Sequence, residues 1–262
     1  MNVSEGYKNN LSKVLKAEIS SRPDRLNLRM RYFFAPEVHR LHALDSEESK
    51  HMVRVLRAEV GDQFILVNGK GGRYHGTLTQ VDKRQCLLET KLMEESMAPA
   101  AQLTLVISPT KSSDRFEWML EKAMEYGVSY IQPIWTQRSE RTKEKQERWQ
   151  RILISALKQS QQLWLTELKP AISWNDFLAT APGAGFIAHC EEGAKDHLFE
   201  ALKPATSCWV AIGPEGDFTA HEIAAAKQAG ACEVSLGDQR LRTETAGLAA
   251  IQMFALAQRK TS

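Results

Sequence analysis

The chain has 262 residues, of which 43% are hydrophobic and 25% are charged, a composition typical of a globular protein with a sizeable core. No apolar run approaches the roughly 18 residues that a membrane span needs, and the N-terminus lacks an apolar stretch of the signal-peptide type, so we expect a cytoplasmic protein. The four cysteines are scattered, without a Cys-x-x-Cys pair or histidines at metal spacing, which favours buried free thiols and no bound metal.

The net charge of +2 is divided unevenly along the chain. Residues 1–29 carry six Lys/Arg and three Asp/Glu, whereas the remainder carries 28 basic and 29 acidic residues, a net charge of −1. A nucleic-acid-binding surface on the main body must therefore be a local patch of basic residues. We interpret residues 1–29 as a flexible extension, with a basic RNA-contacting arm as the alternative.

Short apolar segments alternate with turn residues between residues 30 and 95. The pattern predicts antiparallel hairpins and a small β-barrel, with strands at 32–34, 64–67, 74–81 and 85–92. A helix is expected at about 46–57. Lys50, Arg54 and Arg57 fall on one face of that helix because they are spaced by four and three residues. This face is either a phosphate-contacting surface or an ordinary solvated one.

Residues 94–102 lack periodicity and are predicted to form a linker. Beyond them, strand-like runs alternate with helical ones, as in an α/β domain with a mainly parallel sheet. We expect strands at 103–107, 130–135, 186–190, 208–212 and 233–236. We expect a helix from Asp114, capped through its spacing with Glu117, and a second helix over 143–162. A third is expected from a Thr219/Glu222 capping box to Gly230, and a fourth over about 244–259. The last helix is apolar nearly all round, so it requires either deep packing or a partner chain.

Two glycine-containing segments follow the last two predicted strands. They are Gly-Pro-Glu-Gly-Asp-Phe at 213–218 and Leu-Gly-Asp-Gln-Arg-Leu-Arg-Thr-Glu-Thr-Ala at 236–246. In open α/β sheets, ligands bind at the carboxyl ends of the strands. Glycine lets the backbone approach a ligand closely, and proline stiffens the turn. The two loops are therefore expected to present backbone N–H and C=O groups to a flat, polar small molecule.

These two segments resemble the C-terminal signature of the RsmE-type ribosomal RNA (uracil-N3) methyltransferases of the SPOUT superfamily. The resemblance begins near Met30, and the order of its motifs along the chain makes it specific. The upstream motifs are residues 51–57 with Gly61-Asp62, Lys111, Lys122 before Gly127-Val128, and Gln159-Ser160.

Three positions depart from the usual sequence of that family. Asp217 stands where a second glycine is usual, which adds a carboxylate beside the expected cofactor loop. Leu241 follows Arg240 directly where the family has an Ile-Leu pair, and Gln162 stands where an arginine is common, at one RNA contact.

The resemblance implies a PUA-like RNA-binding β-barrel at 30–95 and a SPOUT α/β domain at 103–262 that ends in a trefoil knot, a feature that general folding rules would not predict. It further implies a homodimer that uses S-adenosylmethionine, without a metal, to methylate N3 of a specific uridine of 16S ribosomal RNA in the small subunit. The implied cofactor-binding residues lie in three loops: His189, Cys190, Glu191, Ile212, Gly213, Pro214, Glu215, Gly216, Leu236, Gly237, Arg240, Leu241, Thr243, Thr245 and Ala246.

Arg242 is the candidate catalytic residue, because a guanidinium can stabilise negative charge on the carbonyl oxygens that flank uracil N3. Glu244 is expected to order Arg242 or its loop, unless it is simply an acidic residue favoured by the helix dipole. The expected RNA contacts are Lys50, Arg54, Arg57, Arg138 and Ser139.

Two other functions remain open. A SPOUT enzyme for another RNA, such as a ribose 2′-O-methyltransferase, would keep the cofactor loops and change the substrate, although the N-terminal barrel speaks against it. A non-catalytic RNA-binding protein would need the barrel alone. A dehydrogenase or NTPase is disfavoured because neither Gly-x-Gly-x-x-Gly nor a P-loop sequence occurs.

Overall fold

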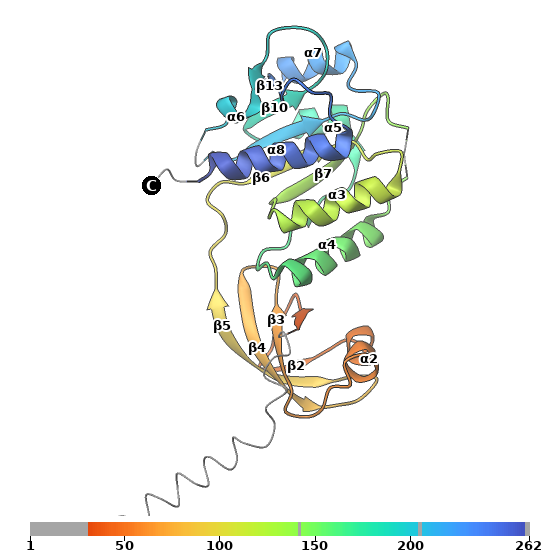
Figure 1. The fold of residues 1–262 in the computed structure, drawn as a ribbon, viewed down its shortest axis with the longest axis vertical. Coiled ribbons are helices and arrows are strands. Elements are labelled where there is room, and N and C mark those ends of the chain that lie inside the picture. Colours follow the sequence, from red (N-terminus) through yellow and green to blue (C-terminus); the bar gives the residue numbers. More distant parts are fainter. Residues whose placement is uncertain (1–30, 141–142, 204–205, 260–262) are drawn as a thin grey trace, which may run out of the picture. The chain divides into compact units, whose positions relative to one another are not determined.

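The computed structural model describes residues 31–140, 143–203 and 206–259, which form two β-sheets and their packed helices (Figure 1). The expected extension at residues 1–29 lies outside the described residues. The helices are α2 (Ser46–Arg54), α3 (Ser113–Glu125), α4 (Gln146–Ser160), α5 (Trp174–Thr180), α6 (Leu198–Ala201), α7 (Ala220–Gln228) and α8 (Thr243–Ala257). Within these ranges, no helix is both long and apolar enough to cross a membrane.

The first sheet has five strands in the order β1-β3-β4-β5-β2. Its strands are β1 (Tyr32–Phe34), β2 (Leu41–Ala43), β3 (Gln63–Val67), β4 (Gly72–Gln80) and β5 (Leu87–Glu95). The predicted hairpins β3–β4 and β4–β5 are confirmed as antiparallel pairs, whereas β1 pairs with β3 in parallel. Strand β2, which the sequence pattern did not predict, pairs with β5.

Helix α2 is shorter than predicted. It begins after Asp45, whose carboxylate accepts a hydrogen bond from Glu48 N at 2.8 Å, and it ends at Arg54. The chain then turns, and Arg57 adopts a left-handed backbone conformation with φ of 50°. Lys50 and Arg54 therefore share the helix, but the prediction that Arg57 lies on the same helical face is wrong.

The second sheet has eight strands, in the order β11-β13-β10-β12-β6-β7-β8 with β9 also pairing with β7. All of its pairings are parallel, as predicted for an α/β domain. The strands are β6 (Leu103–Ile107), β7 (Tyr130–Trp135), β8 (Glu167–Leu168), β9 (Ile172–Ser173), β10 (Ala184–Ala188), β11 (Asp196–His197), β12 (Cys208–Ile212) and β13 (Cys232–Ser235).

Helices cover both faces of this second sheet. Successive residues of a strand point to opposite faces. In β6, Leu103, Leu105 and Ile107 join a buried cluster with α3, α4 and α8, whereas Val106 joins a second cluster with α5 and α7. Burial on both faces explains why the strands read as continuous apolar runs in the sequence.

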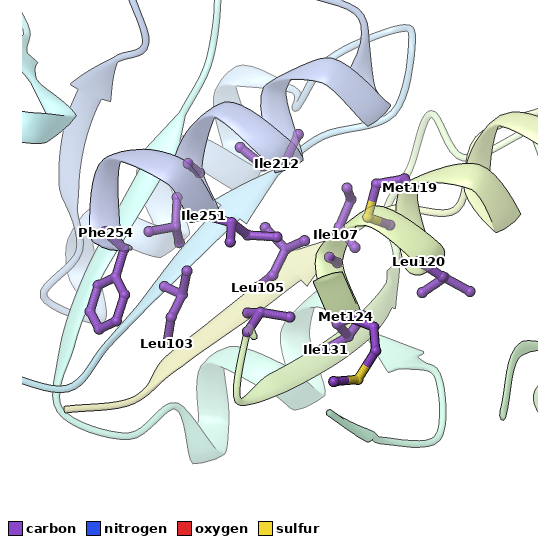
Figure 2. Close-up of a cluster of buried hydrophobic side chains, with 14 of the residues drawn as sticks. Leu103, Leu105, Ile107, Met119, Leu120, Met124, Ile131, Ile212, Ile251 and Phe254 are labelled. Atoms are coloured by element: carbon purple, nitrogen blue, oxygen red, sulfur yellow. The ribbon is translucent and has the colours of Figure 1, made fainter. Parts of the chain in front are cut away.

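Helix α8 packs directly on β6. Ile251 and Phe254 are 2% and 8% exposed, and Figure 2 shows them beside strand β6. The approach is close, because a Cβ atom on Gly247 would lie 2.9 Å from Ile107 Cδ1. One side of this apolar helix is thus covered by its own domain, while Leu256 on another side remains 42% exposed.

The helix starts test two capping predictions. The prediction that Asp114 and Glu117 cap α3 is wrong, since the N-cap residue is Ser112 and Glu117 instead accepts a hydrogen bond from Arg148 Nη2 at 2.6 Å. The capping box predicted at the start of α7 is confirmed, with both of its reciprocal hydrogen bonds.

Strand β10 ends at Ala188, two residues before the predicted end. His189 and Cys190 therefore lie in the loop that follows the strand. Five further elements of two to seven residues, β8, β9, α5, β11 and α6, were not predicted. Such short segments hold too few residues for a periodic pattern to emerge.

Candidate functional site

A cavity of about 690 Å³ lies at the carboxyl ends of β10, β12 and β13. Its wall is formed by the loops that follow these three strands and by the first turns of α8. This is the edge of a parallel sheet at which ligands bind, and the volume falls in the usual range for small-molecule sites.

Most residues expected to bind a cofactor line this cavity. They are His189, Cys190, Ile212, Gly213, Pro214, Glu215, Leu236, Gly237, Arg240, Leu241, Thr243 and Ala246. Glu191, Gly216 and Thr245 do not line it. Lys195 and Asp217 line the cavity but were not among the predicted contacts. Asp217 was visible in the sequence as a departure from the glycine-rich pattern, whereas no motif pointed to Lys195.

The loop at 213–218 is tightly folded. Asp217 N donates a hydrogen bond to Pro214 O at 2.9 Å, which closes a turn. A Cβ atom on Gly213 would lie 3.0 Å from Phe218 N, so this position favours glycine. Thr243 Oγ1 donates to Gly213 O at 3.1 Å and thereby ties the loop to the start of α8.

The same loop is fastened to the loops that follow β6 and β7. Lys111 N donates to Glu215 Oε1 at 3.0 Å, and Arg138 Nη1 donates to Gly216 O at 2.8 Å. Ser139 is hydrogen-bonded through its hydroxyl group at the end of β7. Arg138, expected to contact RNA, thus also holds the loop that lines the cavity, and RNA contacts by Arg138 and Ser139 remain predictions.

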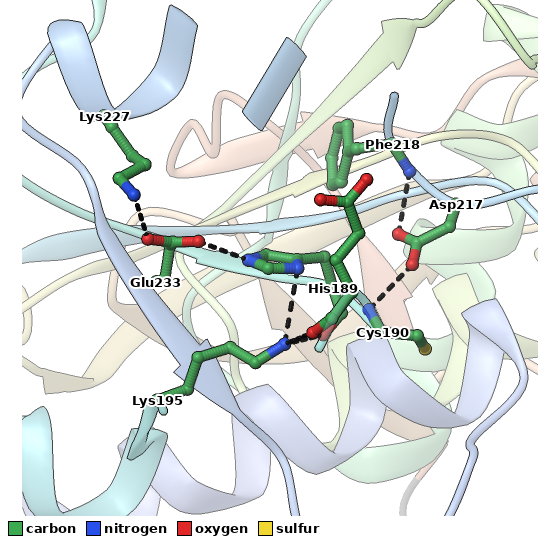
Figure 3. A network of polar contacts seen from close by, with 8 residues as sticks. His189, Cys190, Lys195, Asp217, Phe218, Lys227 and Glu233 are labelled. Atoms are coloured by element: carbon green, nitrogen blue, oxygen red, sulfur yellow. Dashed lines mark hydrogen bonds and ion pairs between the residues drawn. The ribbon is translucent and has the colours of Figure 1, made fainter. Parts of the chain in front are cut away.

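The loop after β10 is held by a charged network around His189 (Figure 3). Burial lowers the pKa of His189, and the nearby Lys195 ammonium lowers it further. The neutral ring can accept a hydrogen bond at Nδ1 from Lys195 Nζ at 3.4 Å and donate one from Nε2 to Glu233 Oε1 at 3.1 Å. A hydrogen bond from Lys227 lowers the pKa of Glu233, which keeps that partner ionised.

Cys190 lies in the same loop but is unsuited to nucleophilic chemistry. Burial raises the pKa of its thiol, and the neighbouring Asp217 carboxylate raises it further. The thiolate, which is the reactive form, is therefore scarce at neutral pH. Across the described ranges, no group of three or more His, Cys, Asp or Glu residues could hold a metal ion.

The two candidate catalytic residues occupy different surroundings. Arg242 is exposed, precedes the first turn of α8 and lines the cavity. Glu244 is 7% exposed, and its Oε1 lies 3.8 Å from Arg115 Nε of α3. The structure thus pairs Glu244 with Arg115 across the α3–α8 contact, so it does not support the prediction that Glu244 orders Arg242.

The predicted basic contacts Lys50, Arg54 and Arg57 lie on α2 and the turn after it. All three are exposed, and none of them lines the cavity. Helix α2 is joined to α4 by an ion pair between Glu48 Oε1 and Lys158 Nζ at 2.8 Å. These cations remain candidates for phosphate contacts that are separate from the cavity.

Two family models match the chain. Residues 97–255 match an RNA methyltransferase domain, and residues 44–91 match an RNA methyltransferase PUA domain. The chain is also 30% identical over 230 residues to the ribosomal RNA small subunit methyltransferase E of a Synechocystis strain. The aligned region covers 84% of this chain and 75% of that protein.

Solved structures agree with these matches. A probable rRNA-methyltransferase from Porphyromonas gingivalis is 34% identical with a TM-score of 0.80, covering 87% of this chain and 98% of its own. A ribosomal RNA small subunit methyltransferase E from Neisseria gonorrhoeae, bound to S-adenosyl methionine, is 31% identical with a TM-score of 0.78, covering 88% and 98%.

Proposed function

Because the chain belongs to the family of the ribosomal RNA small subunit methyltransferases E, we propose that it transfers a methyl group from S-adenosylmethionine to N3 of a uridine in 16S ribosomal RNA. The observation that carries the proposal is the cavity at the carboxyl ends of β10, β12 and β13, because it gathers the three loops expected to hold the cofactor and places Arg242 in their wall.

The residues present fit this cofactor. S-adenosylmethionine carries a flat adenine, a carboxylate, an ammonium and a sulfonium, and the cavity wall offers groups of both charges, including Lys195, Arg240 and Glu215. Backbone groups of the tight loops suit the polar edge of adenine, since they are already ordered before binding. When bound, the cofactor supplies an activated methyl group.

The protein's own task is to orient the uridine and to stabilise charge. Uracil N3–H is a weak acid, so the proton must leave or be shared as N3 becomes a nucleophile. Negative charge then spreads onto the flanking carbonyl oxygens. Arg242 is assigned to those oxygens because its exposed guanidinium lines the cavity and offers several N–H donors.

Recognition of the RNA is assigned to the PUA-like domain at 30–95 and catalysis to the domain at 103–262, with residues 1–29 as an extension. The exposed cations Lys50 and Arg54 on α2 support an RNA-binding role for the first domain. Phosphate contacts position an RNA without selecting its sequence. The choice of uridine therefore depends on how these contacts and the cavity hold the RNA together.

A C-terminal trefoil knot and a homodimer complete the proposal. The knot is proposed from the family to which the chain belongs, because the convergence of three loops on one cavity is common to open α/β sheets. The dimer is assigned to the side of α8 that its own domain leaves partly exposed, where Leu248, Met253 and Leu256 lie.

The proposal is tested by incubating the protein with isotope-labelled S-adenosylmethionine and small ribosomal subunits from cells that lack this protein. After digestion to nucleosides, mass spectrometry should find the label on the base of a uridine. Label on a ribose would instead indicate 2′-O-methylation. RNA binding without any transfer, by protein that binds S-adenosylmethionine, would overturn the enzymatic role with this substrate.

A further inference from the structure

The loops that follow β10 and β12 are joined beyond the ends of their strands. The two strands pair up to Ala188 and Ile212, and the ladder stops there. Past that point, Asp217 Oδ2 accepts a hydrogen bond from Cys190 N at 2.7 Å, while Oδ1 accepts one from Phe218 N at 2.7 Å (Figure 3). One carboxylate thus bridges both loops with its two oxygens.

The backbone of Asp217 shows that this side chain occupies an unusual place. Its φ is 63°, in the left-handed region where glycine is the default residue and where Asp and Asn are tolerated better than other side chains. Its N–H closes the turn to Pro214, so the conformation is fixed by the loop itself. The turn would therefore form equally well with glycine, so the Asp217 carboxylate is not needed to shape the turn itself.

The loop after β10 is held from its other side by a positive charge. Lys195 Nζ donates to His189 O at 2.9 Å and also to Glu191 O. The N–H of Cys190 is thus bound by a carboxylate, while the carbonyl groups on either side of it are bound by an ammonium. Lys195 is a local contact within one loop, whereas Asp217 fastens that loop to the neighbouring one.

We propose that Asp217 is a positioning residue that keeps the segment 189–191 in the conformation that lines the cavity before any ligand arrives. This inference rests on the proposed function, because the ligand whose binding it favours is S-adenosylmethionine. His189, Cys190 and Asp217 all line the cavity, so the bridge shapes its wall directly. A wall that is already ordered lowers the entropy cost of binding, and the apparent affinity rises with the fraction of molecules in the competent state.

Two substitutions separate the bridge from the backbone. Asp217→Gly removes both acceptors and suits the left-handed φ, so the loop backbone is not strained. Asp217→Asn keeps one side-chain oxygen and also suits this conformation. By calorimetry, the dissociation constant of S-adenosylmethionine should rise about tenfold in the glycine variant and about threefold in the asparagine variant, because the competent fraction falls by those factors.

Steady-state kinetics provide a readout that a general loss of stability would not reproduce. The Michaelis constant for S-adenosylmethionine should rise in Asp217→Gly, while the turnover number at saturating cofactor stays within about twofold, because saturating ligand restores the ordered loop. Glu192→Gln is the matched control: it removes a negative charge from an exposed position of the same loop that does not line the cavity. It should leave both constants unchanged.

Hydrogen exchange of the Cys190 amide in cofactor-free protein tests the bridge itself. Exchange should be faster in Asp217→Gly and intermediate in Asp217→Asn. Wild-type protein without measurable S-adenosylmethionine binding would refute the proposed function. If the wild type binds S-adenosylmethionine normally and Asp217→Gly binds it equally well, the role of Asp217 is refuted while the proposed function stands. Equal exchange of the Cys190 amide in the wild type and in Asp217→Gly would have the same meaning.

Discussion

Arg242 lines the cavity with an exposed side chain, directly before the first turn of α8. We expect Arg242→Ala to lower turnover by about a hundredfold or more, as removal of one preorganised donor to a developing oxyanion does. The dissociation constant of S-adenosylmethionine should change little, because the charge that Arg242 matches develops only on the uracil. Single-turnover methylation of small subunits, together with calorimetry, measures both quantities.

Arg242→Lys is the companion variant. It should recover only part of the rate, since a point charge does not reproduce the planar fork of a guanidinium. If rate and cofactor affinity fall by the same factor in Arg242→Ala, then Arg242 is a member of the binding wall, and the oxyanion is stabilised by another group.

His189 should make cofactor binding sensitive to acid. Its folded pKa is lowered, first by burial and then by Lys195, so the folded protein resists protonation that the unfolded chain accepts below about pH 6.5. The stabilisation from neutral His189 is complete above that pH and is lost as the pH falls through the lower, folded pKa. A protonated ring would repel Lys195 and loosen the loop, so affinity for S-adenosylmethionine should be lower at a pH below the folded pKa of His189 than at pH 8.

Calorimetric titrations of His189→Gln at both pH values check this expectation, because the variant should show a smaller change in affinity than the wild type. His42→Gln is the control. Burial also lowers the pKa of His42, but this residue belongs to the first sheet, and it does not line the cavity. Its substitution should change the pH dependence of stability and leave that of cofactor affinity intact. Equal behaviour of all three proteins would show that other groups govern the acid response.

At the scale of single residues, the site could be predicted where the signal was local. Gly213 and Gly237 were found because glycine directly follows an apolar strand run. Lys195 could not be found, because its hydrogen bonds to His189 and Glu191 depend on how the loop folds back. The pairing of Glu244 with Arg115 was likewise invisible, since it joins two helices that meet only in the folded domain.

At the scale of elements, α2 is the clearest candidate for contact with RNA. Lys50 and Arg54 are exposed and lie one turn apart on it. Changing both to Ala should weaken RNA binding and make the slope of log affinity against log salt shallower by up to about two units. Each phosphate contact contributes somewhat less than one unit to that slope. Filter-binding titrations at several salt concentrations measure the slope.

Arg57→Ala provides the comparison within the same segment. Arg57 stands after the end of α2 in a left-handed turn, so its effect reports whether the RNA follows the helix or the turn. Affinity for S-adenosylmethionine should be unchanged in every one of these variants. A salt slope that stays at the wild-type value would mean that the cations of α2 are merely solvated.

The elements that sequence patterns predicted well are the long ones. Strand β6 and helix α7 were predicted with nearly the observed bounds, because the strand is continuously apolar and the helix begins with a capping box. The end of α2 was missed because Val55 and Leu56 continue the apolar pattern although the helix has stopped. Strand pairing was harder still, since the parallel pairing of β1 with β3 depends on a connection of many residues.

At the scale of the whole molecule, α8 links the core of the domain to the proposed dimer. Ile251 is 2% exposed in the core, whereas Leu256 is 42% exposed on the outer side. Leu256→Asp should therefore shift a dimer to monomer while the fold persists, because a charge in an apolar interface is costly only when the partner covers it. Light scattering gives the mass, and circular dichroism reports the fold.

Ile251→Asp is expected to behave differently. It places a carboxylate against β6 and should unfold the domain at any protein concentration. Wild-type protein that is monomeric at micromolar concentration would refute the proposed dimer. Association that survives Leu256→Asp in a folded protein would place the interface on another surface.

The two sheets share part of their cores, which the predicted linker did not suggest. In β3, Phe64 and Leu66 belong to the core of the first sheet, whereas Ile65 and Val67 join the cluster of α3, α4 and α8. The two predicted domains are therefore joined by continuous side-chain packing through β3 as well as by the predicted linker. The continuous apolar run of this strand was visible in the sequence, but it gave no sign of which partner each face would find.

The positions of the four cysteine thiols allow occupancy of the cavity to be measured by chemical labelling. Cys190 and Cys232 are exposed, whereas Cys86 and Cys208 are buried, and burial raises the pKa of Cys208 to about 12. Cys190 lines the cavity and Cys232 does not. With a reagent applied at alkaline pH, where the Cys190 thiolate forms, a molecule in the cavity shields one thiol from alkylation and leaves the other open, so the ratio of the two labelled peptides measures the fraction of filled sites without turnover or RNA.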